Sequence, residues 1–113
     1  MTDNIPGNQE MGPLLPPEKR EYELEYKHGA DLFKRALDDY SKSDNIFQKE
    51  EYKEVMEKAM QVLNETAAEL KKQELLKHNQ SIEKDFSTFQ KLDDKASINK
   101  LSKDLEKAKK SIG

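Results

Sequence analysis

Between Ala30 and Ile112 the chain contains neither glycine nor proline, so nothing in this long stretch strongly interrupts a helix. Ala, Glu, Lys, Leu and Arg together make up about half of the sequence, as is typical of long helices and coiled coils. A breaker-free segment of this composition favours α-helices over β-strands. The sequence therefore predicts an all-α protein.

The N-terminal segment differs in kind, because it holds all four prolines, at positions 6, 13, 16 and 17. Proline fixes φ and lacks a backbone N–H, so neither a helix nor a central strand can be sustained there. We expect residues 1–15 to form a flexible, disordered tail and residues 16–113 to form a single helical domain. An alternative is that Gly12–Pro17 is a docking motif that lies extended in an aromatic groove.

The first predicted helix covers residues 17–42. Pro17 suits the first turn of a helix, where its missing N–H costs nothing. Apolar residues then recur on one stripe at helical spacing: Tyr22, Tyr26, Phe33, Leu37 and Tyr40. Gly29 falls in the same stripe and would let another backbone approach closely.

The pattern stops at Ser41–Asn45, where Ser, Asp and Asn favour turns and helix caps. Ile46 and Phe47 would then pack at the entry of a second helix as a hydrophobic staple. That helix, over 47–77, carries a heptad seam of Tyr52, Met56, Ala59, Leu63, Thr66, Leu70 and Gln73. The seam predicts coiled-coil-like packing against another helix.

Beyond Leu76 the apolar stripe continues on a rotated face, formed by Leu75, Asn79, Ile82, Phe86 and Phe89. Either one long helix runs over residues 48–91 through a stutter, or residues 78–81 interrupt it and Ser81 caps a third helix. The preferred prediction is the break, with a third helix over 81–92. Asp93, Asp94 and Ser97 offer a further cap for a helix over 97–112, whose stripe is Ile98, Leu101, Leu105, Ala108 and Ile112.

These segments predict a small antiparallel three-helix bundle, with 97–112 as an extension or a fourth helix; a long helical hairpin is the alternative. Such a short, polar chain buries a thin core. The free energy gained by burial is then nearly offset by the cost of ordering the chain, about 1.5 kcal/mol per residue. Self-association or a partner would add buried surface.

Several function classes find no support in the sequence. The chain has no cysteine, and its 20 basic and 23 acidic residues nearly cancel. Glu25 and His28 share a helix face, but a di-metal bundle needs a second such pair, and Glu74 precedes His78 by four residues rather than three. We predict no metal, no cofactor and no enzymatic activity, because nearly all the carboxylates are expected opposite the apolar stripes and no glycine-rich phosphate loop exists.

The predicted partner-binding residues are apolar positions that lie off the stripes, together with two tyrosines of the first helix: Leu24, Leu32, Met60, Ala67, Tyr22 and Tyr26. In a small monomer the four aliphatic residues would be exposed. The alternative is that they pack against another helix of the same chain, and that the tyrosines belong to the core.

The sequence thus predicts a non-catalytic helical protein–protein interaction module, such as a small adaptor, an assembly factor or a secretion-type chaperone, which binds another protein or itself through an apolar helix face. A self-assembling structural coiled coil, a homo-oligomer, is the main alternative. A weak nucleic-acid or membrane-surface binder through the lysine-rich residues 100–113 is a third, although Asp104 and Glu106 interrupt the lysines and no aromatic residue is interleaved. With no apolar run of about 20 residues and no signal-peptide pattern, we expect a cytoplasmic protein without a membrane span.

Overall fold

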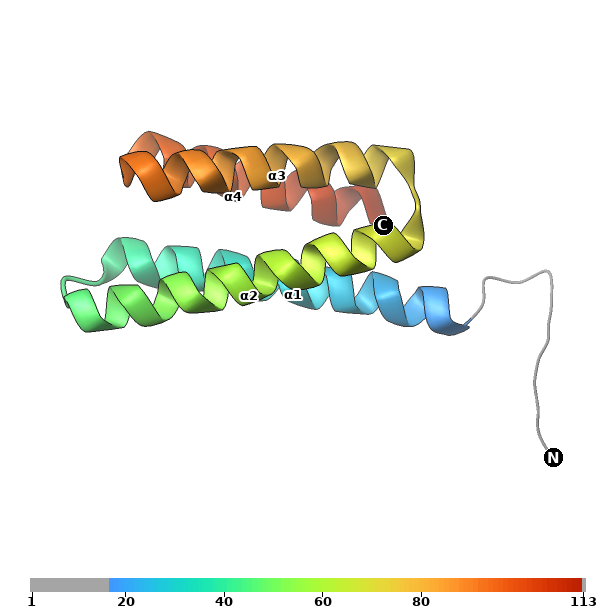
Figure 1. Cartoon of the computed structure of the whole chain (residues 1–113), viewed down its shortest axis with the longest axis horizontal. Helices are drawn as coiled ribbons and strands as arrows, with labels where there is room; N and C mark the ends of the chain where they lie inside the picture. Colours follow the sequence, from blue (N-terminus) through green and yellow to red (C-terminus); the bar gives the residue numbers. More distant parts are fainter. Residues whose placement is uncertain (1–16, 113) are drawn as a thin grey trace, which may run out of the picture.

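The computed structural model describes residues 17–112, which form four α-helices and no strand. These are α1 (Pro17–Lys42), α2 (Ile46–Leu70), α3 (Gln73–Leu92) and α4 (Lys95–Ile112). They run up, down, up and down as two helical hairpins that lie side by side (Figure 1). The predicted antiparallel bundle is confirmed in its four-helix form. The predicted tail, residues 1–15, lies outside the described residues.

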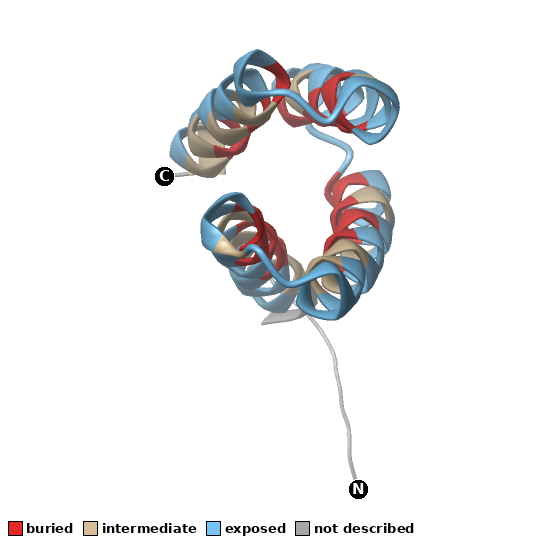
Figure 2. Cartoon of the chain, turned by 90° about the vertical axis from the view of Figure 1, so that its left-hand side faces the viewer, coloured by how far each residue is buried: buried red, intermediate tan, exposed pale blue. Residues whose placement is uncertain are grey.

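The four helices pack around one core in a ring (Figure 2). The most extensive contact joins α1 to α2, the next joins α3 to α4, and the hairpins meet through α1 with α4 and α2 with α3. Gly29 lies at the α1–α2 contact, where an added Cβ would lie 3.2 Å from Cγ1 of Val62 and 3.3 Å from Cδ2 of Leu63. The atoms that approach this glycine belong to side chains of α2, whereas the sequence predicted the approach of another backbone.

The apolar stripes face inwards and form the core, with the members at the helix ends partly buried and Gln73 exposed. At the centre the aromatic rings of α1 and α3 meet across the bundle: Phe33 lies edge-on to Phe86 at a centroid distance of 5.0 Å, and Tyr40 edge-on to Phe89 at 5.2 Å. Edge-to-face contacts are the arrangement that aromatic rings prefer. The core is therefore shared by both hairpins.

A constant register relates the diagonal helices α1 and α3. The hydroxyl of Tyr26 donates to Oδ1 of Asn79 (3.0 Å), and that of Tyr40 donates to Oδ1 of Asp93 (2.8 Å), both across 53 residues. Phe33 and Phe86 have the same separation. Because α1 and α3 run parallel, one heptad repeat on each helix brings these pairs together.

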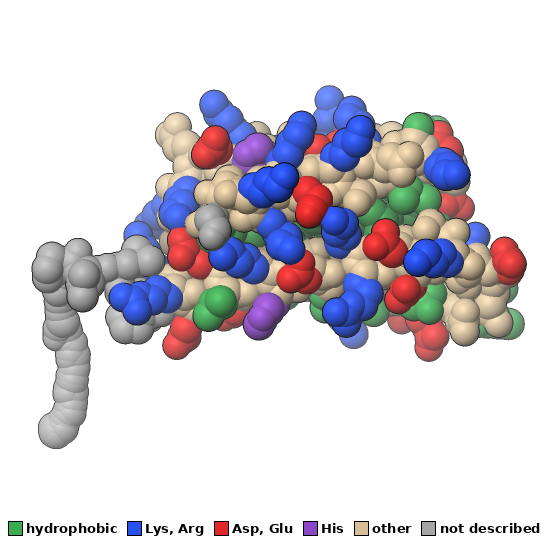
Figure 3. Space-filling view, turned by 180° about the vertical axis from the view of Figure 1, so that it is seen from behind, with side chains coloured by type: hydrophobic (Ala, Val, Ile, Leu, Met, Phe, Trp, Pro, Cys, Tyr) green, Lys and Arg blue, Asp and Glu red, His purple; other side chains and the backbone are tan. Residues whose placement is uncertain are grey.

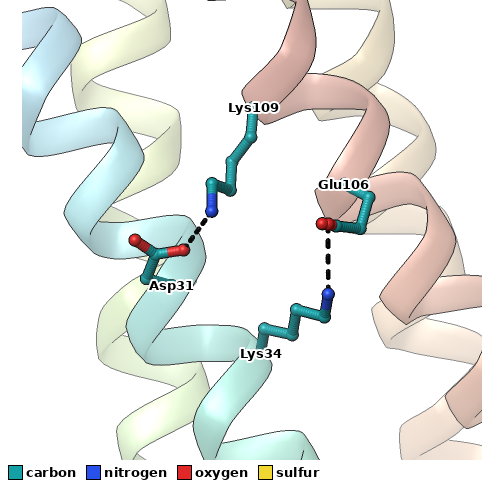
Figure 4. Close-up of polar contacts among 4 residues, drawn as sticks. All are labelled: Asp31, Lys34, Glu106 and Lys109. Atoms are coloured by element: carbon teal, nitrogen blue, oxygen red, sulfur yellow. Dashed lines mark hydrogen bonds and ion pairs between the residues drawn. The ribbon is translucent and has the colours of Figure 1, made fainter.

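Two ion pairs connect α1 to α4 on the outside of the bundle (Figure 4). Lys109 Nζ lies 2.5 Å from Asp31 Oδ1, and Lys34 Nζ lies 3.1 Å from Glu106 Oε2. The bond to Asp31 raises the pKa of Lys109, and the bond to Lys34 lowers the pKa of Glu106. Exposed ion pairs of this kind contribute little to the free energy of folding. Here they join complementary charges of α1 and α4.

The helix ends agree with the sequence at two turns. Asn45 caps α2, where its Oδ1 accepts from the backbone N–H groups of Phe47 (2.9 Å) and Gln48 (3.2 Å). Asp94 Oδ1 accepts from the N–H of Ser97 (2.8 Å), and hydrogen bonding from the side chain and then the backbone of Ser97 lowers the pKa of Asp94. The hydrophobic staple is wrong, because Ile46 and Phe47 are exposed rather than packed.

The break between the second and third helices is not where the sequence placed it. Helix α2 ends at Leu70 and α3 begins at Gln73, so both the long helix over 48–91 and the break at 78–81 are wrong. Lys71 turns the chain in a left-handed conformation (φ 55°), with its N–H bonded to the carbonyl of Ala67. Asn79 and Ser81 lie inside α3, where the amide of Asn79 makes tertiary hydrogen bonds instead of a turn.

Candidate interaction surface

Half of the predicted partner-binding residues belong to the core. Met60 is 6% exposed, and Ala67 and Tyr26 are fully buried. The reason is that α2 has two neighbours, α1 and α3, so its apolar face is wider than the single heptad seam read from the sequence. The expectation that Met60 and Ala67 are exposed is corrected, and these three residues cannot touch a partner while the bundle stays closed.

The other three lie at the surface of α1. Leu24 and Leu32 are exposed, at 57% and 47% of their full areas. Tyr22 is half-buried and lines an open pocket of about 480 Å³ between α1 and α2, beside Glu25 and Val62. The structure does not bring the six residues together into one surface.

A different group of large apolar side chains stands exposed at one end of the bundle. Ile46 is 69% exposed, Phe47 80% and Leu92 61%. The first two begin α2 and the third ends α3, so both positions lie at the end of the bundle that carries the α1–α2 and α3–α4 turns (Figure 1), the end that faces the viewer in Figure 2. We call these three residues the apolar end.

Polar contacts hold this end of the bundle in place. The hydroxyl of Tyr40 donates to Asp93, beside the α3–α4 turn, and the ammonium groups of Lys49 and Lys53 lie 5.0 and 5.7 Å from the Tyr40 ring centroid. Burial, with the bond to Asp93, raises the pKa of Tyr40 to about 12, so its hydroxyl stays a donor at neutral pH. These contacts of Tyr40 therefore connect the two hairpins close to the apolar end.

Sequence reasoning missed the apolar end for identifiable reasons. The sequence predicts a hydrophobic staple at Ile46 and Phe47. Neither residue, however, continues the heptad seam that starts at Tyr52, so neither is in phase with the core-facing side of the helix. Leu92 received no role, yet it falls three residues after Phe89, where a stripe with alternating spacings of 4 and 3 requires four. A phase mismatch of this kind is the signal that could have found it.

A second unexpected feature is a pair of carboxyl groups between α3 and α4. Asp85 is only 5% exposed and faces Asp104, whose Oδ2 is buried without a hydrogen-bond partner among the described residues. Lys100 Nζ lies 3.6 Å from Oδ1 of Asp85. Burial first, then the hydrogen bond and the charge of Asp85, raise the pKa of Asp104 to about 7, so the pair holds a proton near neutral pH.

This pair adjoins an open pocket of about 220 Å³ between the same two helices, lined by Lys84, Asp85, Thr88, Leu92, Asp94, Ala96, Ser97 and Lys100. Asp85 is an exception to the prediction that nearly all acidic side chains lie opposite the apolar stripes. The described residues contain no cluster of three His, Cys, Asp or Glu side chains able to hold a metal ion. What the pair can do on its own is exchange a proton and so alter the α3–α4 contact.

Within residues 17–112, none of the helices is long and apolar enough to cross a membrane. Comparison of the chain with family models, with curated proteins and with solved structures found no match in any of the three.

Proposed function

We propose that this chain is a non-catalytic helical module that binds another protein through the apolar end of its bundle. The observation that carries the proposal is Phe47, which leaves 80% of its area in water although the bundle has a well-formed core. Burial of such a side chain contributes about 1.5–3 kcal/mol. A partner that covers Phe47 would gain this contribution, and one broad enough to reach Ile46 and Leu92 at the same end of the bundle would gain more, because exposed apolar side chains of this kind mark interaction sites.

The finer assignment follows the sequence analysis. An adaptor, an assembly factor or a secretion-type chaperone would each present such an end to an apolar segment or helix of its client. A cytoplasmic location and the absence of enzymatic activity stay predictions.

The test compares capture by the wild-type chain with capture by surface variants. The full chain, tagged at its N-terminus, is used to purify bound proteins from its native cell, and these are quantified by mass spectrometry. We expect one protein at near-equal stoichiometry with the wild type. Phe47→Ser and Leu92→Ser each reduce its recovery by at least tenfold, with circular dichroism showing an intact helical fold.

Leu24→Ser and Leu32→Ser are the matched controls, because each removes an exposed leucine on α1 without touching the apolar end. They are expected to retain the partner. Loss of the partner with the α1 variants alone would move the site to α1. A wild-type chain that captures no partner would contradict the proposed function.

A further inference from the structure

The outer surface of α2 is acidic along its length. Its exposed acidic residues recur at helical spacing on the side away from the core: Glu50, Glu51, Glu54, Glu57, Glu65 and Glu69. We call these the glutamate stripe; Lys58 lies among them, and Nζ of Lys53 lies 4.0 Å from Oε1 of Glu50. Within the described part of the chain, Glu54, Glu57 and Glu69 form no ion pair. No lysine or arginine of the described residues therefore pairs directly with these three carboxylates.

The outer surface of α4 has the opposite character. Lys100, Lys103, Lys107 and Lys110 are all exposed, at successive spacings of 3, 4 and 3 residues that place them on one face of the helix. We call them the lysine stripe. Lys100 lies near Asp85, whereas the other three form no ion pair with any residue in 17–112. Basic side chains gather over the α3–α4 hairpin in Figure 3.

The two stripes point away from each other. Helices α2 and α4 lie diagonally across the ring, and each packs on α1 and α3. One chain therefore cannot join its own stripes. At about 1.5 Å per residue, the glutamate stripe from Glu50 to Glu69 is about 28 Å long and the lysine stripe about 15 Å long, so the second fits within the first.

We propose that copies of this chain associate head to tail, with the lysine stripe of one copy against the glutamate stripe of the next. A two-fold dimer that places like stripes together would bring like charges into contact, which opposes it. Because the stripes lie on opposite sides, the contact is heterologous and each added copy leaves a free stripe at either end. Association built on exposed charges is weak and falls with salt.

This proposal does not depend on the apolar end. Its test is sedimentation velocity on the full chain over a range of protein concentrations. At about 0.01 M ionic strength, where the Debye length is about 30 Å, the mean mass is expected to rise with concentration beyond a dimer. At about 1 M salt, where that length is about 3 Å, the chain is expected to be monomeric. Phe47→Ser should leave both results unchanged.

Two charge-reversed variants identify the stripes. The first carries Lys103→Glu with Lys107→Glu, and the second carries Glu54→Lys with Glu57→Lys. Each alone is expected to stay monomeric at low salt, and an equimolar mixture is expected to associate again, because each variant restores the complement of the other. A control with Lys77→Glu and Lys91→Glu on α3 has the same change of net charge as the first variant but lies outside both stripes, and it should associate like the wild type.

Several results would overturn the proposal. A wild-type chain that is monomeric at every concentration and salt would do so, as would a mixture of reversed variants that fails to associate while the wild type does. RNA and anionic membranes are the other occupants that lysines attract. If the monomeric wild type binds a short RNA duplex or phosphatidylserine vesicles, and the first reversed variant does not, the lysine stripe serves that ligand instead of a second copy.

Discussion

At the scale of single residues, a chain of polar groups that begins in the core and ends at the surface links three helices through Asn79. The Tyr26 hydroxyl donates to Oδ1 of Asn79, whose Nδ2 donates to Oδ1 of Asn64 at 2.5 Å; Nδ2 of Asn64 in turn donates to Oε2 of Glu83 at 3.2 Å. Burial raises the pKa of Tyr26 well above its usual value, so the hydroxyl remains a donor. Buried polar groups need such partners, since an unpaired one destabilises the fold.

Tyr26→Phe tests this network, because it removes the donor and leaves the buried Oδ1 of Asn79 unpaired. We expect the free energy of unfolding to fall by about 1–2 kcal/mol, measured by urea denaturation. Tyr52→Phe, at a half-buried tyrosine on α2, is the control and should change the stability by less than about 0.5 kcal/mol. Equal effects of the two substitutions would show that the network contributes nothing.

The carboxyl pair between α3 and α4 predicts a pH-dependent stability. Asp104 has a pKa raised from 3.8 to about 7 in the folded chain, where Asp85 faces it and Lys100 and Lys107 partly offset the effect. Between these two values the folded chain holds a proton that the unfolded chain has released. Stability contributed by this group is therefore full below about pH 4 and is lost as the pH rises through 7.

Asp104→Asn removes this titration, because its amide cannot ionise. The difference in unfolding free energy between the variant and the wild type should shift in favour of the variant as the pH rises from about 4 to 8. Urea denaturation across this range measures it, and contributions from unrelated groups cancel in the difference. Asp38→Asn on the exposed face of α1 is the control. A difference that does not change with pH would contradict the assignment.

At the scale of helices, the interior spacings were predictable and one boundary was not. The stripes of α1, α3 and α4 could be read because core contacts recur every three or four residues. The break at Lys71 could not, because lysine is not a turn residue and the neighbouring sequence holds neither glycine nor proline. The sequence signal for the true boundary was the change of phase between Leu70 and Leu75. Asn79 and Ser81 are residue types that favour turns, and they led to a predicted break at 78–81 instead.

Lys71→Gly should stabilise the bundle. Lys71 adopts φ 55°, a left-handed conformation that costs a residue with a Cβ about 1–2 kcal/mol and glycine little. Because glycine also makes the unfolded chain more flexible, we expect a net gain of about 1 kcal/mol in thermal or urea unfolding. Asp93 has φ 48° but accepts the bond from Tyr40, so Asp93→Gly should gain less or lose stability. A larger gain at Asp93 would refute this account.

The candidate site was less predictable than the fold, because exposure depends on which helices become neighbours. Met60 lies off the heptad seam yet is buried, since a third helix covers that side of α2. Phe47 is a large aromatic residue of the kind that usually enters a core, yet in the first turn of α2 it stays exposed. Periodicity describes one helix at a time, whereas these outcomes are set by the assembly of all four.

At the scale of the whole molecule, the aromatic contacts between α1 and α3 make the two hairpins one cooperative unit. Phe86 packs on Phe33 of the other hairpin and stacks on Phe89 of its own at 6.4 Å. If the hairpins were separate units joined only by the turn at Lys71, a change in one would leave the other protected. The shared core predicts instead that both lose stability together.

Phe86→Leu tests this coupling without emptying the core, because leucine keeps most of the buried volume. Native-state hydrogen exchange reports the opening free energy of each helix separately. We expect the most protected amides of α1 and α2 to lose about 1–1.5 kcal/mol, the same amount as those of α3 and α4. Protection lost in α3 and α4 alone would mean that the hairpins open independently. The contact between Phe33 and Phe86 would then contribute nothing to the stability of α1.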